Sequence, residues 1–509
     1  MKMTTVALFS ALLFLISLQA QTASTNEGLP LKIVGGAPFV HNKNYGPLED
    51  RDSTEVKAYP APEGAPVFSG RKTILIAGGK NFEVPLYETP VWGGRAYHGT
   101  IDCNKTARVE IAVTDVELAS AVVRPLSKKI APKISGNKIR FEIDGPGKYT
   151  VEINGNLDDA IHLFVNPVEK NVPSKGGDGI VYYAPGFYDN VGILRPKSGE
   201  TWYIAGGAYL HRARFELRDV SNVTLRGRGI IDTAGRLNGY KKDPNTEHSL
   251  LAYQCTDLSI EGLTFLDANN FCTVYRRSHD VRIRNVKVIA KDGNTDQNDI
   301  IGCQRVHLSD VFLRGYDDGI VVKVAMEAKD LHSCDILAES SVIWTDLAHP
   351  LTVGTEIMNN VYRVTFTNID ILHVREPAHN SRALAIHVGD DGTVHDITFT
   401  DIRIEALSPP FANGDIDLIQ LEIKPNVFSK TQKPGYIRNI LFRNITLLDA
   451  PFFPPVAIKG FDEWHTIENI RFENVVVKGK KLLSFDDGKF QTNEFVKNIK
   501  FSSGTQKSE

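Results

Sequence analysis

A short pattern of alternating polar and apolar residues recurs through roughly the last three hundred residues of the chain. Each copy has a polar residue, often Asn or Asp, at its second position and apolar residues at its third and fifth positions. Alternation with a period of two predicts β-strands that bury one face. The copies are SNVTLRG at Ser221, TDLSIEG at Thr256, HDVRIRN at His279, QRVHLSD at Gln304, YRVTFTN at Tyr362, HDITFTD at His395, RNILFRN at Arg438, ENIRFEN at Glu468 and KNIKFSS at Lys497.

The spacing of the copies predicts how these strands stack. The first apolar residues of three successive copies are Leu258, Val281 and Val306, which lie 23 and 25 positions apart. This period is too short for a four-stranded propeller blade, and the Leu and Asn frame of leucine-rich repeats is absent. We therefore predict a parallel β-helix, in which residues one coil apart in sequence lie about 4.8 Å apart in space.

The first part of the chain lacks this repeat. Before about residue 180, short alternating segments such as TILIAG and KIRFEID are separated by Gly, Pro and Asn turns. Such segments are typical of a β-sandwich. The predicted fold class is therefore all-β, with an N-terminal β-sandwich domain over residues 24–185 and a β-helix domain over residues 186–509.

The N-terminus has the order of residues found in secretory signals. Lys2 precedes the apolar run Val6 to Leu18, and small and polar residues follow through Ala20 and Ala23. The run is too short for a membrane-spanning helix, which needs about 20 apolar residues. We expect a signal peptide over residues 1–23, a secreted or periplasmic protein, and no membrane span in the remainder.

Composition excludes several classes of partner. With 58 basic and 61 acidic residues the formal net charge is −3, so we expect no nucleic-acid partner. The five cysteines include no CxxC pair, which favours buried free thiols over a zinc site. Histidines such as His332, His373 and His379 show no metal-ligand spacing, so we expect no metal and no cofactor. Composition does not predict the oligomeric state.

The candidate chemistry lies between Gly293 and Lys323. Asp296 precedes Asp317 by 21 residues, about one coil, so the two carboxylates are expected on adjacent rungs of one face. Asp318 follows directly, and Gly319 makes plausible the turn or bulge that would bring Asp317 and Asp318 to the same side.

Two interpretations of these carboxylates are open. Taken singly, an Asp-Asp-Gly sequence is typical of a solvated turn, and Asn294 or Asp299 is interpreted as a turn cap. Taken together, clustered carboxylates raise the pKa of at least one member, which leaves a protonated acid beside an ionised base. Inverting glycosidases use such a pair, held about 6.5 to 9.5 Å apart.

The combination of NTD, a gap of one coil, DDGI and Lys323 resembles the signature of glycoside hydrolase family 28, the polygalacturonase family. The resemblance covers roughly Tyr182 to Val476 and implies a right-handed parallel β-helix and hydrolysis with inversion. By resemblance, Asp317 is the general acid, and Asp296 and Asp318 activate the water. Lys323 matches the lysine of the family's DDxIxxK pattern, where it either orients an Asp through a salt bridge or contacts substrate.

Later motifs match this family less well. The segment LAHPLTVGTE places His349 at the family's histidine. Its role is either that of a partner of the acid or that of a structural histidine. Glu356 and Asp346, in the same stretch, are expected beside the site. The family's RIK motif, which holds a uronate carboxylate, falls on Ala385 to His387, so only Arg382 and His387 remain as substitutes. Without a paired Arg and Lys, bidentate recognition of a carboxylate is lost, which favours a neutral or differently charged sugar.

A sandwich ahead of a β-helix is also similar to glycoside hydrolase family 49, the dextranase and isopullulanase family, which acts on neutral α-glucans. Both resemblances imply a polysaccharide or oligosaccharide substrate and an inverting mechanism. Tyr316 and Trp344 are candidate stacking platforms for sugar rings, although aromatic residues in solenoids are more often part of the core.

Two other functions use the same fold. A polysaccharide lyase needs a uronate substrate, often Ca²⁺ and a base that removes the C5 proton, and it releases an ultraviolet-absorbing product. A non-catalytic glycan-binding protein explains the repeats but does not require three Asp residues aligned by the coils.

Overall fold

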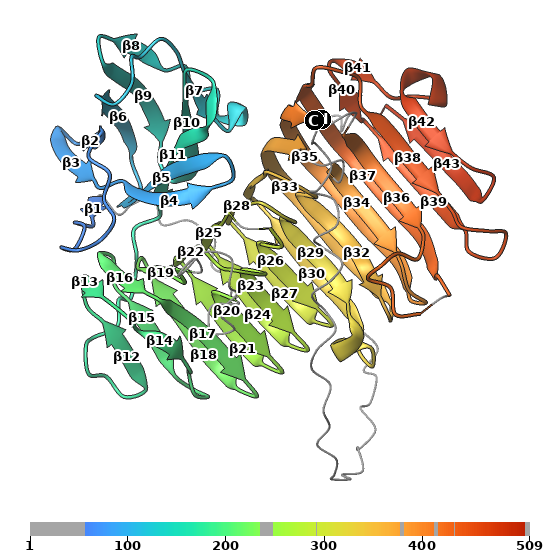
Figure 1. Ribbon diagram of the computed structural model, residues 1–509, viewed down its shortest axis with the longest axis horizontal. Helices are drawn as coiled ribbons and strands as arrows, with labels where there is room; N and C mark the ends of the chain where they lie inside the picture. Colours follow the sequence, from blue (N-terminus) through green and yellow to red (C-terminus); the bar gives the residue numbers. More distant parts are fainter. Residues whose placement is uncertain are drawn as a thin grey trace, which may run out of the picture. The chain divides into compact units, whose positions relative to one another are not determined.

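The computed structural model describes residues 56–234, 248–291, 293–376, 381–411, 416–431 and 433–503 (Figure 1). The predicted signal peptide lies outside these residues, as does His379. The described chain consists of strands, connecting turns and the short 3₁₀ helices η1 (Leu126–Lys128), η3 (Met326–Ala328) and η4 (Phe485–Asp487). No helix in these ranges is long and apolar enough to cross a membrane.

The N-terminal part consists of two sheets that enclose one apolar core. The strands of the first sheet are β1 (Val56–Ala58), β4 (Tyr87–Val91), β5 (Gly94–Cys103), β7 (Ala121–Arg124), β10 (Gly147–Ile153) and β11 (Asn156–Asn166). Those of the second are β2 (Arg71–Ala77), β3 (Lys80–Val84), β6 (Thr106–Val113), β8 (Lys133–Ser135) and β9 (Lys138–Asp144). Their pairings are antiparallel except for β5 with β11. Alternate residues of β2 and β6 are buried between the sheets, as the period of two predicts.

The rest of the chain is a solenoid whose strands pair in parallel, except for one short antiparallel pair near its C-terminal end, Val476–Val477 with Lys480–Lys481. The strands of its long sheet are β12 (Ile180–Tyr183), β13 (Gly186–Tyr188), β15 (Thr201–Ile204), β16 (Ala208–His211), β18 (Ser221–Gly227), β19 (Ile230–Asp232), β21 (Thr256–Glu261), β22 (Thr264–Leu266), β24 (His279–Arg284), β25 (Lys287–Ile289), β27 (Gln304–Ser309), β28 (Phe312–Gly315), β30 (Ser333–Glu339), β31 (Val342–Thr345), β33 (Val361–Glu376), β35 (Thr393–Phe411), β37 (Tyr436–Asp449), β39 (Ile467–Glu473), β40 (Val476–Val477), β41 (Lys480–Lys481) and β43 (Val496–Ser502). β12 pairs with β15, so solenoid pairing begins ahead of residue 186.

A second solenoid sheet closes each coil. Its strands are β14 (Gly192–Leu194), β17 (Ala213–Arg218), β20 (Leu250–Tyr253), β23 (Thr273–Arg276), β26 (Asn298–Ile301), β29 (Ile320–Val324), β32 (Leu351–Ile357), β34 (Arg382–Val388), β36 (Asp417–Ile423), β38 (Pro455–Lys459) and β42 (Lys489–Thr492). Leu258, Val281 and Val306 are register partners and are fully buried, as the spacing of the repeats predicts. Both solenoid sheets contribute to one continuous apolar core.

The polar residue near the start of each copy has a backbone role. Asn222, Asp257 and Asp280, each the second residue of its copy, have φ values of 54°, 54° and 58°. Asn and Asp tolerate this left-handed conformation better than most residues with a side chain. The repeated polar position therefore marks a left-handed residue at the second position of each of these strands.

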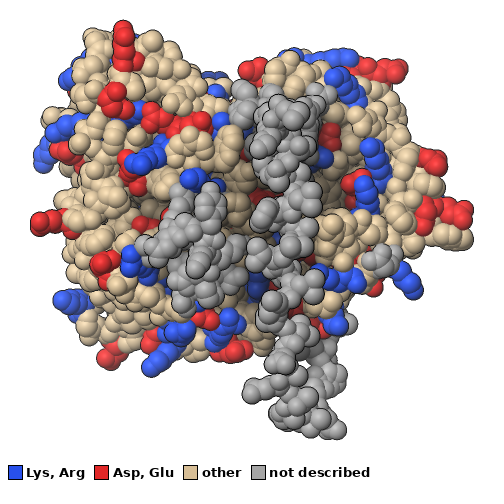
Figure 2. Space-filling model, viewed as in Figure 1, with Lys and Arg blue, Asp and Glu red and all other residues tan. Residues whose placement is uncertain are grey.

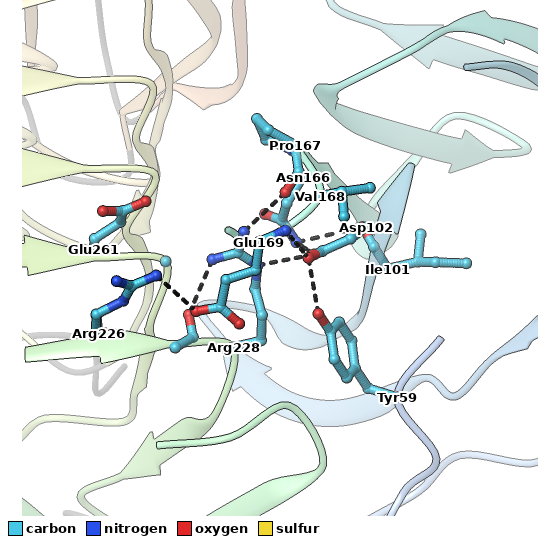
Figure 3. Close-up of polar contacts among 12 residues, drawn as sticks. Tyr59, Ile101, Asp102, Asn166, Pro167, Val168, Glu169, Arg226, Arg228 and Glu261 are labelled. Atoms are coloured by element: carbon cyan, nitrogen blue, oxygen red, sulfur yellow. Dashed lines mark hydrogen bonds and ion pairs between the residues drawn. The ribbon is translucent and has the colours of Figure 1, made fainter. Parts of the chain in front are cut away.

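The sandwich packs against the outer face of the long solenoid sheet. Tyr87, Val91 and Phe164 of the sandwich share an apolar cluster with residues of the solenoid, among them Phe312 and Trp344. A buried ion pair lies beside this cluster (Figure 3): Arg228 donates from Nε to Oδ1 of Asp102 over 2.8 Å.

The Asp102 carboxylate is satisfied from both parts of the chain. Its Oδ2 accepts hydrogen bonds from the Tyr59 hydroxyl at 2.8 Å and the Glu169 backbone N–H at 3.0 Å. Arg228 also donates from Nη2 to the Pro167 carbonyl over 2.9 Å. Buried charges are tolerated when they are paired and hydrogen-bonded in this way. The sandwich and the solenoid are thus joined by apolar packing and by a buried polar network.

Acidic and basic side chains are interspersed over the face seen in Figure 2, without a broad field of either sign. This distribution agrees with the formal net charge of −3. The five cysteines are buried and free, as predicted.

Candidate active site

Asp296, Asp318 and His349 lie just ahead of three neighbouring strands of the second solenoid sheet. β26, β29 and β32 pair in parallel and are side by side in Figure 1. Each of the three residues is two positions before the first residue of its strand, and those first residues are register partners. The coil register therefore places the three positions on adjacent rungs, and Asp317 directly precedes the middle one.

Backbone hydrogen bonds extend the register beyond the strands. Gln297 N–H donates to the Asp318 carbonyl over 2.7 Å, and Gly319 N–H donates to the His349 carbonyl over 2.8 Å. A Cβ atom at Gly319 would lie 2.3 Å from the carbonyl oxygen of Pro350, so the close approach of these two turns requires glycine. Gly319 thus fixes the turn that carries Asp317 and Asp318.

His349 is bonded to Asp318 through two of its own groups. Its backbone N–H lies 2.8 Å and its ring Nδ1 2.6 Å from the same oxygen, Oδ1 of Asp318. Because an ionised carboxylate only accepts hydrogen bonds, Nδ1 carries the proton in this contact. Burial alone would raise the pKa of Asp318, but the charge and hydrogen bonds of His349 outweigh it and hold that pKa below its ordinary value.

Asp317 has the opposite electrostatic environment. Burial, followed by the negative charge of Asp318, raises the pKa of Asp317 to about 6. Its Oδ1 accepts the backbone N–H of Asp318 at 3.0 Å, and its carbonyl accepts Nε2 of Gln297 at 3.0 Å. The two adjacent carboxyl groups therefore differ in pKa: the pKa of Asp317 is raised and that of Asp318 is lowered.

Lys323 lies between two buried carboxyl groups. Its ammonium lies 3.5 Å from Oδ2 of Asp296 and 3.5 Å from Oδ2 of Asp299, and 4.5 Å from the centre of the Phe271 ring. Burial, and then the charge of Asp299, raises the pKa of Asp296 well above its ordinary value. Burial opposes the charge on Lys323, but Asp299, Glu356 and Asp296 outweigh it and raise the pKa of Lys323.

Asp299 is the residue of this cluster that sequence reasoning missed, because it was interpreted as a turn cap. It lies within β26, where burial raises its pKa to about 6. The spacing of Asp299 and Lys323 in the sequence could have indicated this pair. Lys323 follows Asp299 by one coil and two residues in the strand register, and a buried lysine needs carboxylate partners.

The residues expected to replace the uronate-binding pair are already neutralised. Arg382 lies 3.0 Å from Oδ2 of Asp417. Nε2 of His387 lies 2.6 Å from Oε1 of Gln420, and burial, followed by the charge of His349, lowers the pKa of His387 to about 3. The His387 ring meets the His349 ring edge to face at 5.2 Å. The structure thus brings His387 to the carboxylate cluster as a neutral group.

Two other expectations are corrected by burial. Trp344 is 0% exposed, with its ring 4.0 Å from the Arg314 guanidinium and 4.2 Å from the His373 ring, so no face is open to a sugar. Asp346, expected beside the site, is buried and accepts hydrogen bonds from Trp344 and Arg375. Both residues lie where the sandwich covers the solenoid. A side chain that points out of the solenoid there is therefore buried against the sandwich.

Glu356 and Tyr316 are partly exposed. Glu356 lies in β32 and affects Lys323 through its charge. Tyr316 directly precedes Asp317, and its backbone N–H donates to Oγ1 of Thr295 over 3.4 Å. Within the part of the chain that the structure describes, no group of three or more His, Cys, Asp or Glu side chains is arranged to hold a metal ion.

A set of carboxyl groups with divergent pKa values, on adjacent coils of a parallel β-helix, is a candidate site for acid and base chemistry of the kind that glycoside hydrolysis uses. The family model of glycosyl hydrolases family 28 matches residues 204–484, more than half of the chain. The chain belongs to this family, and it is a glycoside hydrolase built on a β-helix.

The chain is also similar to solved structures. Dex49A from Penicillium minioluteum is similar over 87% of this chain and 96% of its own, with 14% identity and a TM-score of 0.53. An exopolygalacturonase from Thermotoga maritima is similar over 64% of this chain and 84% of its own, with 14% identity and a TM-score of 0.46. A family 28 exopolygalacturonase from Yersinia enterocolitica is similar over 79% and 97%, with 11% identity and a TM-score of 0.44.

No curated protein matches the chain. The predicted fold class, a right-handed parallel β-helix preceded by a β-sandwich, is confirmed.

Proposed function

We propose that this protein hydrolyses the glycosidic bonds of a neutral polysaccharide by a single displacement that inverts the anomeric carbon. The observation that carries the proposal is the divergence in pKa between Asp317 and Asp318, two adjacent carboxyl groups on one turn. An inverting glycosidase needs one carboxylic acid for the leaving oxygen and one carboxylate for the water. The two environments supply these two states at mildly acidic pH.

In the proposed reaction, protonated Asp317 gives its proton to the glycosidic oxygen as the bond to the anomeric carbon breaks. A water molecule attacks that carbon from the opposite face, and ionised Asp318 takes the proton that the water loses. Asp317 is then ionised and Asp318 protonated, and exchange with solvent returns both to their starting states. The result is one new reducing end with inverted configuration.

Asp296 has a supporting role in this scheme. Because burial and Asp299 raise its pKa well above the ordinary value, it is the less suitable of the two predicted bases. We assign it a hydrogen bond that orients the water, with Lys323 holding the Asp296 side chain in place. Lys323 is therefore a positioning residue, which is the salt-bridge alternative of the two considered for it.

The charges around the site favour a neutral sugar. Arg382 is paired with Asp417, Lys323 with Asp296 and Asp299, and His387 is neutral. None of these groups offers an unpaired positive charge to a uronate carboxylate, whereas the ionised Asp318 repels one.

The substrate is tested by a reducing-end assay on a panel of dextran, pullulan, polygalacturonate, rhamnogalacturonan and sulfated galactans, with ultraviolet absorbance read in parallel. We expect new reducing ends on a neutral polymer without absorbance. Cleavage of polygalacturonate alone would contradict the neutral substrate, and an absorbing product would indicate a lyase. Proton NMR of the first product tests the inversion.

The site is tested by Asp317→Asn, with the exposed Asp486→Asn as the matched control. Loss of the general acid is expected to lower kcat by about 10²- to 10⁴-fold on the polymer. On an aryl glycoside with a good leaving group the loss should be much smaller, because that oxygen needs no proton. Equal losses on both substrates, or retained activity on the polymer, would refute the assignment of the acid.

We also propose that the protein is exported. The apolar run Val6 to Leu18 and the small residues after it support a signal over residues 1–23. N-terminal sequencing of the mature protein after expression in its natural host tests this proposal, and an intact Met1 would contradict it.

A further inference from the structure

A turn of the sandwich lies beside the candidate active site. β4 and β5 are joined through Trp92 and Gly93, and Figure 1 shows these strands next to β28, the strand that leads into Tyr316. Val91 of β4 and Phe312 of β28 belong to the same apolar cluster. The turn therefore lies against the solenoid near the end of β28, the strand that precedes Tyr316 and Asp317.

The turn is held firmly on the sandwich. Gly93 has φ +84°, and a Cβ atom there would lie 2.8 Å from the Asp158 carboxyl group. A Cβ atom at Gly94 would lie 2.5 Å from the Asp158 carbonyl oxygen. These two glycines let the turn pack directly against Asp158, which fixes the position of Trp92.

A buried arginine of the solenoid supports the Trp92 ring. Arg375 in β33 is 4% exposed, and its guanidinium carbon lies 4.7 Å from the centre of that ring. Arg375 donates from Nη1 to Asp158 over 2.5 Å and to Asp346 over 3.1 Å. The guanidinium thus joins the sandwich turn to the solenoid and presents a charge to one side of the indole.

Trp92 meets Tyr316, which directly precedes the proposed acid. The two ring centres are 6.3 Å apart with 38° between the planes, and both side chains are partly exposed. Tyr316 also lies near Gly293, where a Cβ atom would be 3.8 Å from the tyrosine ring. The aromatic pair therefore stands between the sandwich turn and the segment that leads to Asp296.

We propose that Trp92 and Tyr316 form a sugar-binding subsite next to Asp317, in which the C–H face of a neutral pyranose ring packs on the aromatic pair. This inference rests on the proposed function. Aromatic rings supply a large apolar contact area with a defined face, which suits the C–H face of a sugar ring. The sandwich then contributes directly to the active site, and Arg375 is the positioning residue for Trp92.

The experiment compares Trp92→Ala and Trp92→Phe with Trp464→Ala on the neutral polymer that the wild type cleaves fastest. Trp464 is 70% exposed and has no part in the site, so it controls for loss of a surface indole. We expect Trp92→Ala to raise KM about 5- to 30-fold with kcat within about twofold, as loss of one aromatic contact predicts. Trp92→Phe should restore most of the affinity, and Trp464→Ala should leave KM unchanged.

Binding is measured separately by intrinsic fluorescence in the Asp317→Asn background. The chain has four tryptophans, of which Trp202 and Trp344 are buried. Oligosaccharides cut from the same polymer should change the emission of Asp317→Asn, and the added Trp92→Phe substitution should abolish that change. A merely structural role for Trp92 would lower thermal stability without either effect.

The outcomes separate this inference from the function on which it rests. If the wild type cleaves a neutral polymer and Asp317→Asn does not, an unchanged KM and an unchanged fluorescence response in the Trp92 variants overturn the subsite alone. If the wild type cleaves no neutral polymer, or Asp317→Asn keeps full activity, the proposed function fails and the subsite with it.

Discussion

Replacing His349 by alanine should move the acidic limb of the pH profile to higher pH. The substitution removes the ring contact of 2.6 Å between Nδ1 and Asp318, while the backbone N–H contact of 2.8 Å remains. A hydrogen bond to a charged group contributes about 1.5 to 3 kcal/mol, and one pKa unit corresponds to 1.36 kcal/mol. The pKa of Asp318 should therefore rise by about 1 to 2 units.

The sign follows from the role of the ionised form. His349 holds the pKa of Asp318 below its ordinary value, so the wild type keeps its base ionised down to acidic pH. Without the ring, Asp318 becomes protonated at higher pH and the base is lost there. The limb set by Asp317, near pH 6, should move much less, and the profile should become narrower.

The assay is kcat/KM on the cleaved polymer from pH 3 to pH 8, because this ratio reports the pKa values of the free enzyme. His395→Ala is the control, since His395 makes a similar contact of 2.8 Å with Asp396 on β35, away from the site. If His349→Ala lowered the rate at all pH values without moving the acidic limb, the ring would not set the pKa of Asp318. The pairing of Asp318 with His349 would then be structural.

Two further predictions concern the basic limb and the domain interface. Because Asp317 acts in its protonated form with a pKa of about 6, wild-type kcat/KM should fall about tenfold per pH unit above that value, and a rate that stayed constant to pH 8 would contradict Asp317 as the acid. Arg228→Met leaves the Asp102 carboxylate buried without its partner, which should cost about 3 to 5 kcal/mol in guanidinium unfolding followed by tryptophan fluorescence. The added Asp102→Asn substitution should recover part of this loss, and Arg443→Met, which breaks an exposed pair with Glu473, should cost at most about 1 kcal/mol. A loss of less than about 1 kcal/mol in Arg228→Met would show that the buried pair does not stabilise the interface.

Local pattern was sufficient to predict the solenoid. Alternation depends on one strand at a time, and the coil length depends on the distance between successive copies, so both can be read without knowing any long-range contact. The same spacing indicated that Asp296 and Asp317 would lie on adjacent coils, because a parallel stack converts a period in sequence into a neighbour in space. In the structure it is Asp318, one residue later, that lies in register with Asp296. The register partners of β26 and β29 have this relationship.

Only the tertiary structure decided how the charged and aromatic side chains are partnered. Asp299 and Lys323, Arg382 and Asp417, and His349 and Asp318 are pairs whose members lie on different coils, and coil spacing alone does not say which side chains turn toward each other. Trp344 was a candidate stacking platform with a core position as the alternative, and the sequence of the solenoid does not show that another domain covers it.

The sandwich accounts for the largest difference between what the sequence predicted and what the tertiary structure shows. The sequence by itself determined that the chain has a β-sandwich, a β-helix and a group of aspartates one coil apart. The tertiary structure decided which outer face of the solenoid is buried, which cations are neutralised, and that Trp92 lies beside Tyr316. The physical reason is that these features depend on which side chains of different coils, or of the sandwich and the solenoid, meet each other, and a single sequence carries no periodic signal for such contacts.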